Sequence, residues 1–112
     1  MSILNRLREK NIERQAHWPG SDKVGVLFRS VEFAGEAGEL CNAVKKLYRA
    51  DNAIKGNSSK ERAPLLENLI EEMGDVLITL DLLAMEYDVD LEKALVDKFN
   101  ATSLKQDIDV LM

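Results

Sequence analysis

Apolar residues recur every three or four positions along most of the chain, which is the spacing of one face of an α-helix. In the segment from about residue 25 to 50, that face carries Phe33, Ala37, Leu40, Cys41, Val44 and Tyr48. From Pro64 to about Tyr87, a broader apolar face carries Leu65, Leu66, Leu69, Ile70, Met73, Val76, Leu77, Leu80, Leu83 and Ala84. No segment shows the two-residue alternation of apolar and polar positions that is typical of a strand. The pattern predicts an all-α protein with two long central helices.

Two shorter helices complete a predicted four-helix, bundle-like protomer. Residues 2–18 form a weakly amphipathic segment that Pro19-Gly20 should end. Asp90 is the expected N-cap of a last helix over residues 91–100. Pro64 suits the first turn of the second long helix, where its missing N–H costs nothing. Residues 49–63 are polar and predict a loop, so residues 1–112 should form one all-α domain.

The two broad apolar faces exceed what four short helices can bury within one chain. The first helix is mostly polar and offers them little cover. We therefore expect a homo-oligomer, a dimer or a tetramer, in which apolar helix faces of different copies pack together. Cys41 falls on the apolar face and is expected in the core.

Each long helix also carries two acidic residues three positions apart, at the edge of its apolar face. These pairs are Glu36 with Glu39 and Glu72 with Asp75. An isolated pair of this kind is usually a solvated surface feature. Glu32, one turn before Glu36, is either a solvated side chain, which is the favoured interpretation, or an outer neighbour of these acids. If the two helix edges face each other, however, four carboxylates meet in a partly buried cleft. Each neighbouring pair would then repel by about 3 kcal/mol at ~5 Å and an effective dielectric near 20, so the cluster would need protons or cations.

The available ligand types limit which cation such a cluster could hold. Oxygen ligands alone suit Mg²⁺, Mn²⁺ or Ca²⁺. A di-iron bundle would need Glu-x-x-His pairs, and the only histidine, His17, follows no glutamate at that spacing. Zinc would need histidine or cysteine ligands, which are nearly absent. Because Mg²⁺ often completes its coordination with substrate phosphates, the pattern favours a phosphate-bearing substrate.

Charge and composition exclude several other classes of function. A net charge of −5 argues against nucleic-acid binding as the main function, since that usually needs a basic face. No apolar run approaches the ~20 residues of a membrane span, and the first residues lack the core of a signal peptide. The single cysteine cannot form an internal disulfide, which fits a reducing compartment. We expect a cytoplasmic protein that binds neither membranes nor nucleic acid.

Several stretches together resemble one family of helical enzymes. "EAGELCNAVKKL" followed by "EEMGDVL" resembles the E-x-x-E and E-x-x-D motifs of the MazG-like nucleoside triphosphate pyrophosphohydrolases. "KFNATSLK" at residues 98–105 resembles the lysine-asparagine segment that follows in this group, and "RQAHWPG" is similar to its small single-domain members. The 32 residues between Glu39 and Glu72 are a departure, because the loop is long for the pattern.

The resemblance implies a reaction and a set of site residues. It implies hydrolysis of (deoxy)nucleoside triphosphates between the α and β phosphates, giving monophosphate and pyrophosphate, as nucleotide-pool house-cleaning. Glu36, Glu39, Glu72 and Asp75 would be ligands of Mg²⁺, with Mn²⁺ as the alternative. Lys98 and Asn100 would contact the substrate.

Three further interpretations remain beside these. Glu39 is the candidate general base, because a carboxylate not fully occupied by metal can take a proton from the attacking water. Trp18 either stacks on a base of the substrate or anchors packing beside Pro19-Gly20. The competing class is a non-catalytic helical module for oligomerisation or regulation, whose acidic cluster is stabilised by metal.

Overall fold

The structure, a computed structural model, describes residues 1–58 and 61–112. Its elements are α1 (Ile3–His17), the short 3-10 helix η1 (Ser21–Lys23), α2 (Val26–Asp51), α3 (Arg62–Met85) and α4 (Leu91–Lys105). The described ranges contain no strand, which confirms the all-α prediction. The last helix is longer than predicted and ends at Lys105 instead of near residue 100. None of the described helices is both long and apolar enough to span a bilayer.

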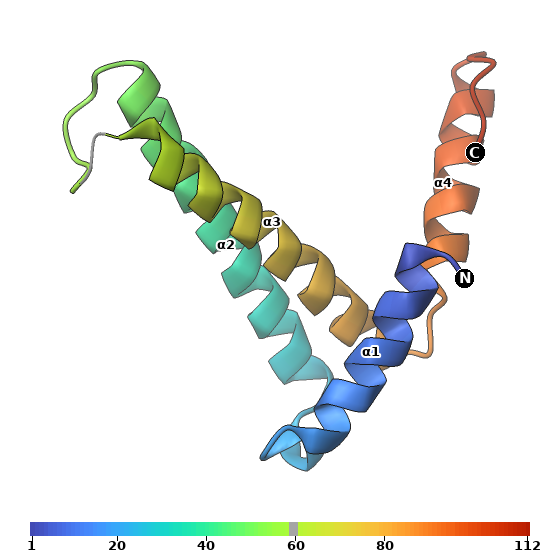
Figure 1. Cartoon of the computed structure of the whole chain (residues 1–112). Helices are drawn as coiled ribbons and strands as arrows, with labels where there is room; N and C mark the ends of the chain where they lie inside the picture. Colours follow the sequence, from blue (N-terminus) through green and yellow to red (C-terminus); the bar gives the residue numbers. More distant parts are fainter. Residues whose placement is uncertain (59–60) are drawn as a thin grey trace.

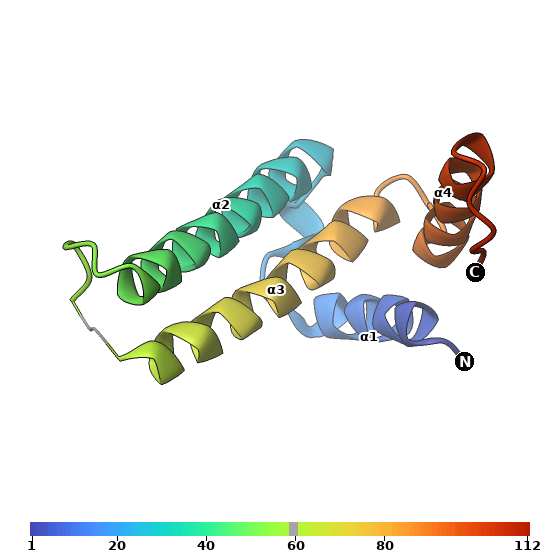
Figure 2. The ribbon, with the colours of Figure 1, turned by 90° about the horizontal axis from the view of Figure 1, so that it is seen from above.

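The four helices form a V (Figure 1). One arm is the antiparallel pair of α2 and α3, which make the most extensive helix contact in the structure. The other arm is α4, which packs mainly on α1, and α1 runs from beside α4 down to the base of the V. Seen from above, α3 lies between α2 and α1 (Figure 2). The divergence of the two arms therefore places α4 away from most of the α2–α3 pair (Figure 1).

Local signals in the sequence explain where the helices begin and end. The side chain of Ser2 accepts a hydrogen bond from the N–H of Asn5, and that of Asp90 accepts one from the N–H of Lys93 at 3.0 Å. The predicted N-cap at Asp90 is thus confirmed. Pro64 lies in the first turn of α3, also as predicted. Gly20 has φ = 84°, a left-handed conformation that favours glycine, and it allows the chain to turn after α1.

A buried polar network joins α1 to α3. Asp81 and Asn11 are each 1% exposed. Arg8 donates from Nε to Asp81 Oδ1 at 3.0 Å, and Asn11 donates from Nδ2 to Asp81 Oδ2 at 2.9 Å. Arg8 also donates to the carbonyl of Val89, in the turn between α3 and α4. The mostly polar α1 is therefore held by hydrogen bonds and charge, which the spacing of apolar residues does not indicate.

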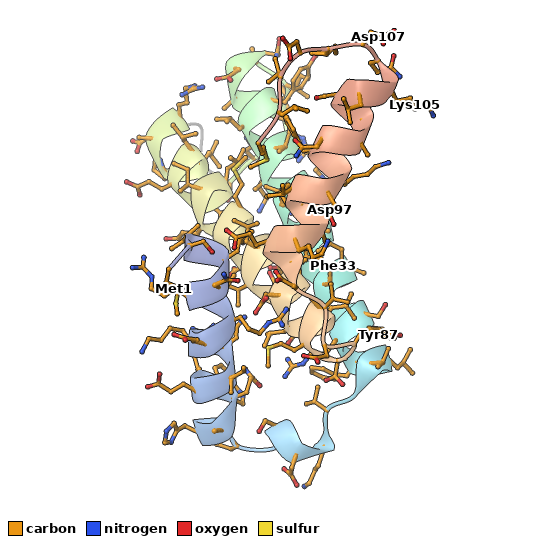
Figure 3. All side chains as sticks on the ribbon, turned by 90° about the vertical axis from the view of Figure 1, so that its right-hand side faces the viewer. Met1, Phe33, Tyr87, Asp97, Lys105 and Asp107 are labelled. Atoms are coloured by element: carbon orange, nitrogen blue, oxygen red, sulfur yellow. The ribbon has the colours of Figure 1, made fainter. Side chains whose placement is uncertain are left out.

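Many apolar side chains of the long helices remain exposed in the single chain. The exposed fraction is 79% for Leu27 on α2 and 58% for Ile70 on α3. Figure 3 views the molecule from the α4 side, with Tyr87 at the turn between α3 and α4 and Phe33 on α2 behind them. The apolar excess that the sequence predicts is thus present on the surface of the protomer.

The expectation that Cys41 belongs to the core is wrong for this chain, because its side chain is exposed. The packed side of α2 carries Ala43, which is 2% exposed. Cys41 precedes Ala43 by two positions, or about 200° around a helix, and so lies nearly opposite. A helix that packs on a single neighbour buries only a narrow stripe of its surface.

Candidate functional site

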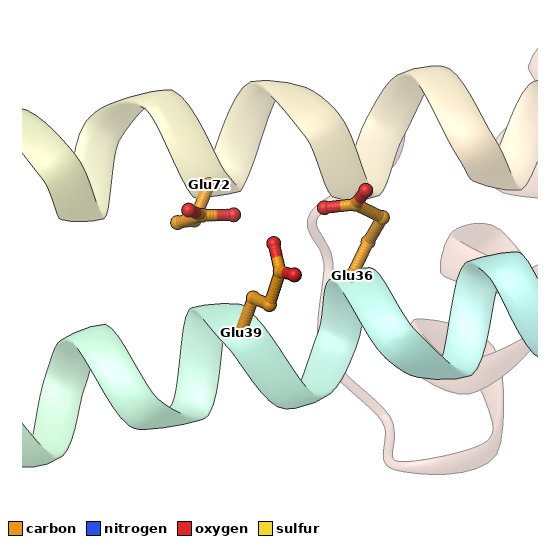
Figure 4. A group of neighbouring side chains, drawn as sticks. All are labelled: Glu36, Glu39 and Glu72. Atoms are coloured by element: carbon orange, nitrogen blue, oxygen red, sulfur yellow. The ribbon is translucent and has the colours of Figure 1, made fainter.

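The antiparallel packing of α2 and α3 brings acidic residues of both helices together. Glu36 and Glu39 extend from α2, and Glu72 extends from α3, into the space between the two helices (Figure 4). One carboxylate oxygen from each of the three lies within 4.8 Å of the others. Residues three apart lie on nearly the same side of a helix, so Glu36 and Glu39 both present their carboxylates to α3. We call Glu36, Glu39 and Glu72 the acidic cluster.

Asp75 lies at the margin of this cluster. It is exposed and does not belong to the three residues whose oxygens converge. Its charge nevertheless raises the pKa of both Glu36 and Glu72. All four predicted acidic positions are therefore electrostatically connected, with Asp75 as the outermost of the four.

Burial and the charges of neighbouring acids disfavour the ionised forms of Glu36 and Glu72 in the acidic cluster. Burial raises the pKa of the Glu36 and Glu72 carboxyl groups above the ordinary value of 4.5, and the neighbouring charges of Glu39 and Asp75 raise it further. One oxygen of each, Oε2, is buried and has no hydrogen-bond partner among the described residues. Buried polar atoms are normally satisfied. Two unsatisfied carboxylate oxygens in one cluster are what a cation site without its ion would show.

The chemistry of the donors limits the cation. The cluster offers only carboxylate oxygens, which suit a hard divalent ion such as Mg²⁺, Mn²⁺ or Ca²⁺. No histidine or thiol takes part in this group, and His17 is exposed on α1. The residues present thus fit an oxygen-coordinated divalent metal ion.

A pocket of about 510 Å³ adjoins the acidic cluster where α1, α2 and α3 meet. Glu32 and Thr79 line it. Glu32 precedes Glu36 by one helical turn, and Thr79 follows Asp75 by one turn and donates its hydroxyl to the Asp75 carbonyl at 2.9 Å. One turn is about 5.4 Å, so the near wall of the pocket lies next to the carboxylates. We call this space the junction pocket; its volume lies within the ~300–1,000 Å³ common for small-molecule sites.

Trp18 lines the junction pocket from the segment after α1. Its side chain is 58% exposed, so it does not act as a buried packing anchor. An exposed indole at the wall of a pocket has a free face on which a planar ligand could stack. Phe28, from the first turn of α2, contributes a second aromatic ring to the same pocket.

The structure does not bring Lys98 and Asn100 to the acidic cluster of their own chain. Both lie on α4, the second arm of the V (Figure 1). Lys98 is exposed. The side-chain amide of Asn100 exchanges two hydrogen bonds with the backbone of Met112, at 2.8 and 3.3 Å, because the C-terminal tail folds back along α4.

Sequence reasoning missed the residues that shape the junction pocket. Arg29 is 6% exposed and forms an ion pair with Glu32 at 2.9 Å, so of the two interpretations of Glu32 the favoured one, a freely solvated side chain, is wrong. Gln15 on α1 completes this contact by accepting from Arg29 at 2.8 Å. The available signal was spacing, because Arg29 precedes Glu32 by three residues on the same helix face. The hydrogen bond between Arg29 and Gln15 depends on tertiary packing, and no pattern in the sequence indicates it.

The long connection between α2 and α3 is basic in sequence, with Lys55, Lys60 and Arg62 near or within it. Arg62 pairs with Asp51 across the loop at 3.0 Å, and Asn57 donates to the carbonyl of Lys46 at 2.7 Å. Lys60 lies outside the described residues. The loop sits at the far end of the α2–α3 arm from the junction pocket (Figure 1).

Comparison with known proteins identified one family. The model of the MazG nucleotide pyrophosphohydrolase domain matches residues 31–103. The match includes the acidic cluster, Asp75, Lys98 and Asn100, and it begins after Trp18. The comparisons with curated proteins and with solved structures returned no match.

Proposed function

Since the chain belongs to the MazG nucleotide pyrophosphohydrolase family, we propose that it hydrolyses nucleoside triphosphates, deoxynucleotides in particular, between the α and β phosphates. The products are a nucleoside monophosphate and pyrophosphate, and the role is removal of unwanted nucleotides from the cytoplasmic pool. The observation that carries the proposal is the convergence of three carboxylates with two buried, unsatisfied oxygens.

Glu36, Glu39, Glu72 and Asp75 hold the metal ion in this proposal. Mg²⁺ is the favoured ion because the ligands are all oxygens, and Mn²⁺ is the alternative. When bound, the ion supplies positive charge that offsets the phosphates and makes a water molecule more acidic. The carboxylates would fix the position of the ion, because α2 and α3 hold them at a fixed spacing on facing sides.

Glu39 is the proposed general base. It lies between Glu36 and Glu72 in the cluster and is more exposed than either (Figure 4). Its charge contributes to the raised pKa of both neighbours. A carboxylate in this place can accept a proton from the water that attacks phosphorus, while the buried oxygens of its neighbours serve the metal.

The nucleoside occupies the junction pocket, with Trp18 against the base. The pocket begins one turn from the acidic cluster, so a nucleotide can place its base there while its phosphates reach the carboxylates. Stacking of a base on an aromatic side chain contributes about 1–3 kcal/mol in nucleic-acid complexes. The same contact would hold the nucleoside here.

A second copy of the chain completes the protein in this proposal. Four large apolar side chains on the α2–α3 arm have exposed fractions between 54% and 79%: Leu27, Val31, Ile70 and Leu77. An isolated soluble chain rarely exposes so much apolar surface on one pair of helices. Packing of another copy on these faces would bury them and would bring α4 of one copy near the arm of the other. Lys98 would then contact phosphate, and Asn100 would do so once the tail releases it. Light scattering at micromolar concentration tests this proposal, and a stable monomer would contradict it.

The activity itself is tested by incubating the protein with a panel of ribo- and deoxynucleoside triphosphates in the presence of Mg²⁺. The expected products, separated by chromatography, are the monophosphate and pyrophosphate. Glu39→Gln should lose activity, whereas Glu67→Gln, an exposed position elsewhere on α3, should keep it. Diphosphate with orthophosphate as products would contradict cleavage between the α and β phosphates. Metal binding without hydrolysis of any nucleotide would instead favour the non-catalytic helical module.

A further inference from the structure

One wall of the junction pocket is a polar triad of Arg29, Glu32 and Gln15. The guanidinium of Arg29 is the buried centre of the triad. It donates from one nitrogen to Glu32 Oε1 at 2.9 Å and from the other to Gln15 Oε1 at 2.8 Å. Both partners are therefore held in place by a side chain that is itself only 6% exposed.

The position of Arg29 determines which atoms of its two partners remain for a ligand. A guanidinium can only donate hydrogen bonds, so the oxygen of the Gln15 amide must face it and the amide NH₂ must be turned away. Glu32 likewise accepts the hydrogen bond from Arg29 with Oε1, so Oε2 is the oxygen that remains. Among the hydrogen bonds of residues 1–58 and 61–112, none ends on Glu32 Oε2 and none begins at Gln15 Nε2. The triad thus offers the pocket one charged acceptor and one neutral donor.

We propose that this triad selects the base of the substrate, and that it favours a base with an exocyclic amine beside an unprotonated ring nitrogen. Cytosine and adenine have this pattern. Their amine would donate to Glu32 Oε2, and their ring nitrogen would accept from the Gln15 amide. The inference rests on the proposed function, because it assumes that the nucleoside occupies the junction pocket.

Bases with a carbonyl in place of the amine fit the triad poorly. In uracil, thymine and hypoxanthine the ring N–H is flanked by a carbonyl oxygen, which would face the Glu32 carboxylate. Two oxygens without a proton between them repel, and the carboxylate would lose its acceptor role. Because the Glu32 side chain is only 26% exposed, water would compensate the loss incompletely.

Two cations on the same pocket offer a competing arrangement. Arg14 and Lys23 also line the junction pocket, and both are exposed. Either could donate to a carbonyl and so favour the opposite set of bases. Their exposure makes them mobile, solvated groups, whereas the triad is held by a buried side chain, and preorganised groups discriminate more strongly.

The test uses pairs of substrates that differ only at the decisive group. dCTP and dUTP differ by an amine against a carbonyl at one ring position, and dATP and dITP differ in the same way. We expect kcat/KM to be roughly ten- to hundredfold higher for the substrate of each pair that carries the amine. This ratio corresponds to the free energy of one charge-assisted hydrogen bond. Equal values, or a preference for the carbonyl substrates, would overturn the proposal; the latter would assign recognition to Arg14 or Lys23.

The variant Glu32→Gln gives the sharper result. Arg29 would hold the new amide by its oxygen, as it holds Gln15, and so turn an NH₂ toward the pocket. The preference for dCTP over dUTP should then shrink at least tenfold or reverse, while Glu67→Gln leaves it unchanged. If Glu32 contacts the sugar instead, the variant will change the ratio of dCTP to CTP and leave the ratio of dCTP to dUTP as it was, which overturns the proposal.

A binding measurement separates this inference from the proposed reaction. Calorimetric titration of the intact protein with dCMP and dUMP, in the presence of Mg²⁺, requires no hydrolysis. Tighter binding of dCMP, lost in Glu32→Gln, supports base selection even if no triphosphate is hydrolysed, a result that would refute only the proposed activity. Hydrolysis of all four triphosphates at similar rates, with equal binding of the two monophosphates, refutes the base selection and leaves the activity standing.

Discussion

Removal of the Asp81 carboxylate should loosen α1 and damage the junction pocket before it damages the acidic cluster. Asp81 accepts from Arg8 and Asn11 in the interior, and Asp81→Ala leaves both donors without an acceptor. Deleting one partner of a buried ion pair costs about 3–5 kcal/mol. The Arg8 side chain retains 20% exposure and can recover some hydration, so the lower end applies, about 3 kcal/mol.

That loss corresponds to a large thermal shift. For a domain of this size, 1 kcal/mol changes Tm by about 4 °C, so Asp81→Ala should lower Tm by about 12 °C at matched protein concentration. Asp81→Asn keeps an oxygen for Arg8 and should lose about half as much. Differential scanning calorimetry measures both variants. A decrease below about 4 °C for Asp81→Ala would refute the view that this network anchors α1.

The kinetic consequence distinguishes anchoring from general damage. Gln15 and Trp18 reach the junction pocket from α1 and the segment after it, whereas Glu36 and Glu72 depend on the contact between α2 and α3. Below its Tm, Asp81→Asn should therefore raise KM several-fold and change kcat little. An equal loss in kcat, with KM unchanged, would show that the acidic cluster depends on this network directly.

Three further predictions concern the acidic cluster and α4. Glu72→Gln should abolish activity but leave Tm without metal equal or higher, because it removes repulsion; a clear loss of metal-free stability would make Glu72 a structural residue. Folding raises the pKa of Glu36 and Glu72 above the ordinary value of 4.5, so the folded state binds their protons more tightly than the unfolded state does. Their contribution to the free energy of unfolding should therefore stabilise the fold below about pH 4.5 and be lost as the pH rises through the raised values. Thermal scans across this range should show that loss without metal and a smaller one with Mg²⁺, and identical profiles would argue against a metal at the cluster. Lys98→Ala should lower kcat/KM about ten- to hundredfold while Mg²⁺ binding persists, with Lys105→Ala as the control on the same helix; unaltered kinetics would remove α4 from the substrate site.

The sequence by itself determined the helices and the composition of the acidic cluster. Apolar spacing, the cap at Asp90 and the proline in the first turn of α3 are local signals, and local signals suffice to place helices. Acidic residues three apart share one side of a helix whatever the tertiary structure. The same spacing on both long helices therefore predicted that Glu36, Glu39, Glu72 and Asp75 could meet. The structure brings oxygens of the first three together and leaves Asp75 exposed beside them.

Only the tertiary structure decided what surrounds that cluster. The pairing of Asp81 with Arg8 and Asn11 joins residues about 70 positions apart, as their hydrogen bonds show, and no periodicity reveals such a contact. The hydrogen bond from Arg29 to Gln15, which forms part of one wall of the junction pocket, is likewise invisible to periodicity. Cys41 was misplaced because periodicity identifies an apolar face without saying how much of it a neighbour covers. Burial depends on how many helices pack on that face, and this number is a property of the whole fold.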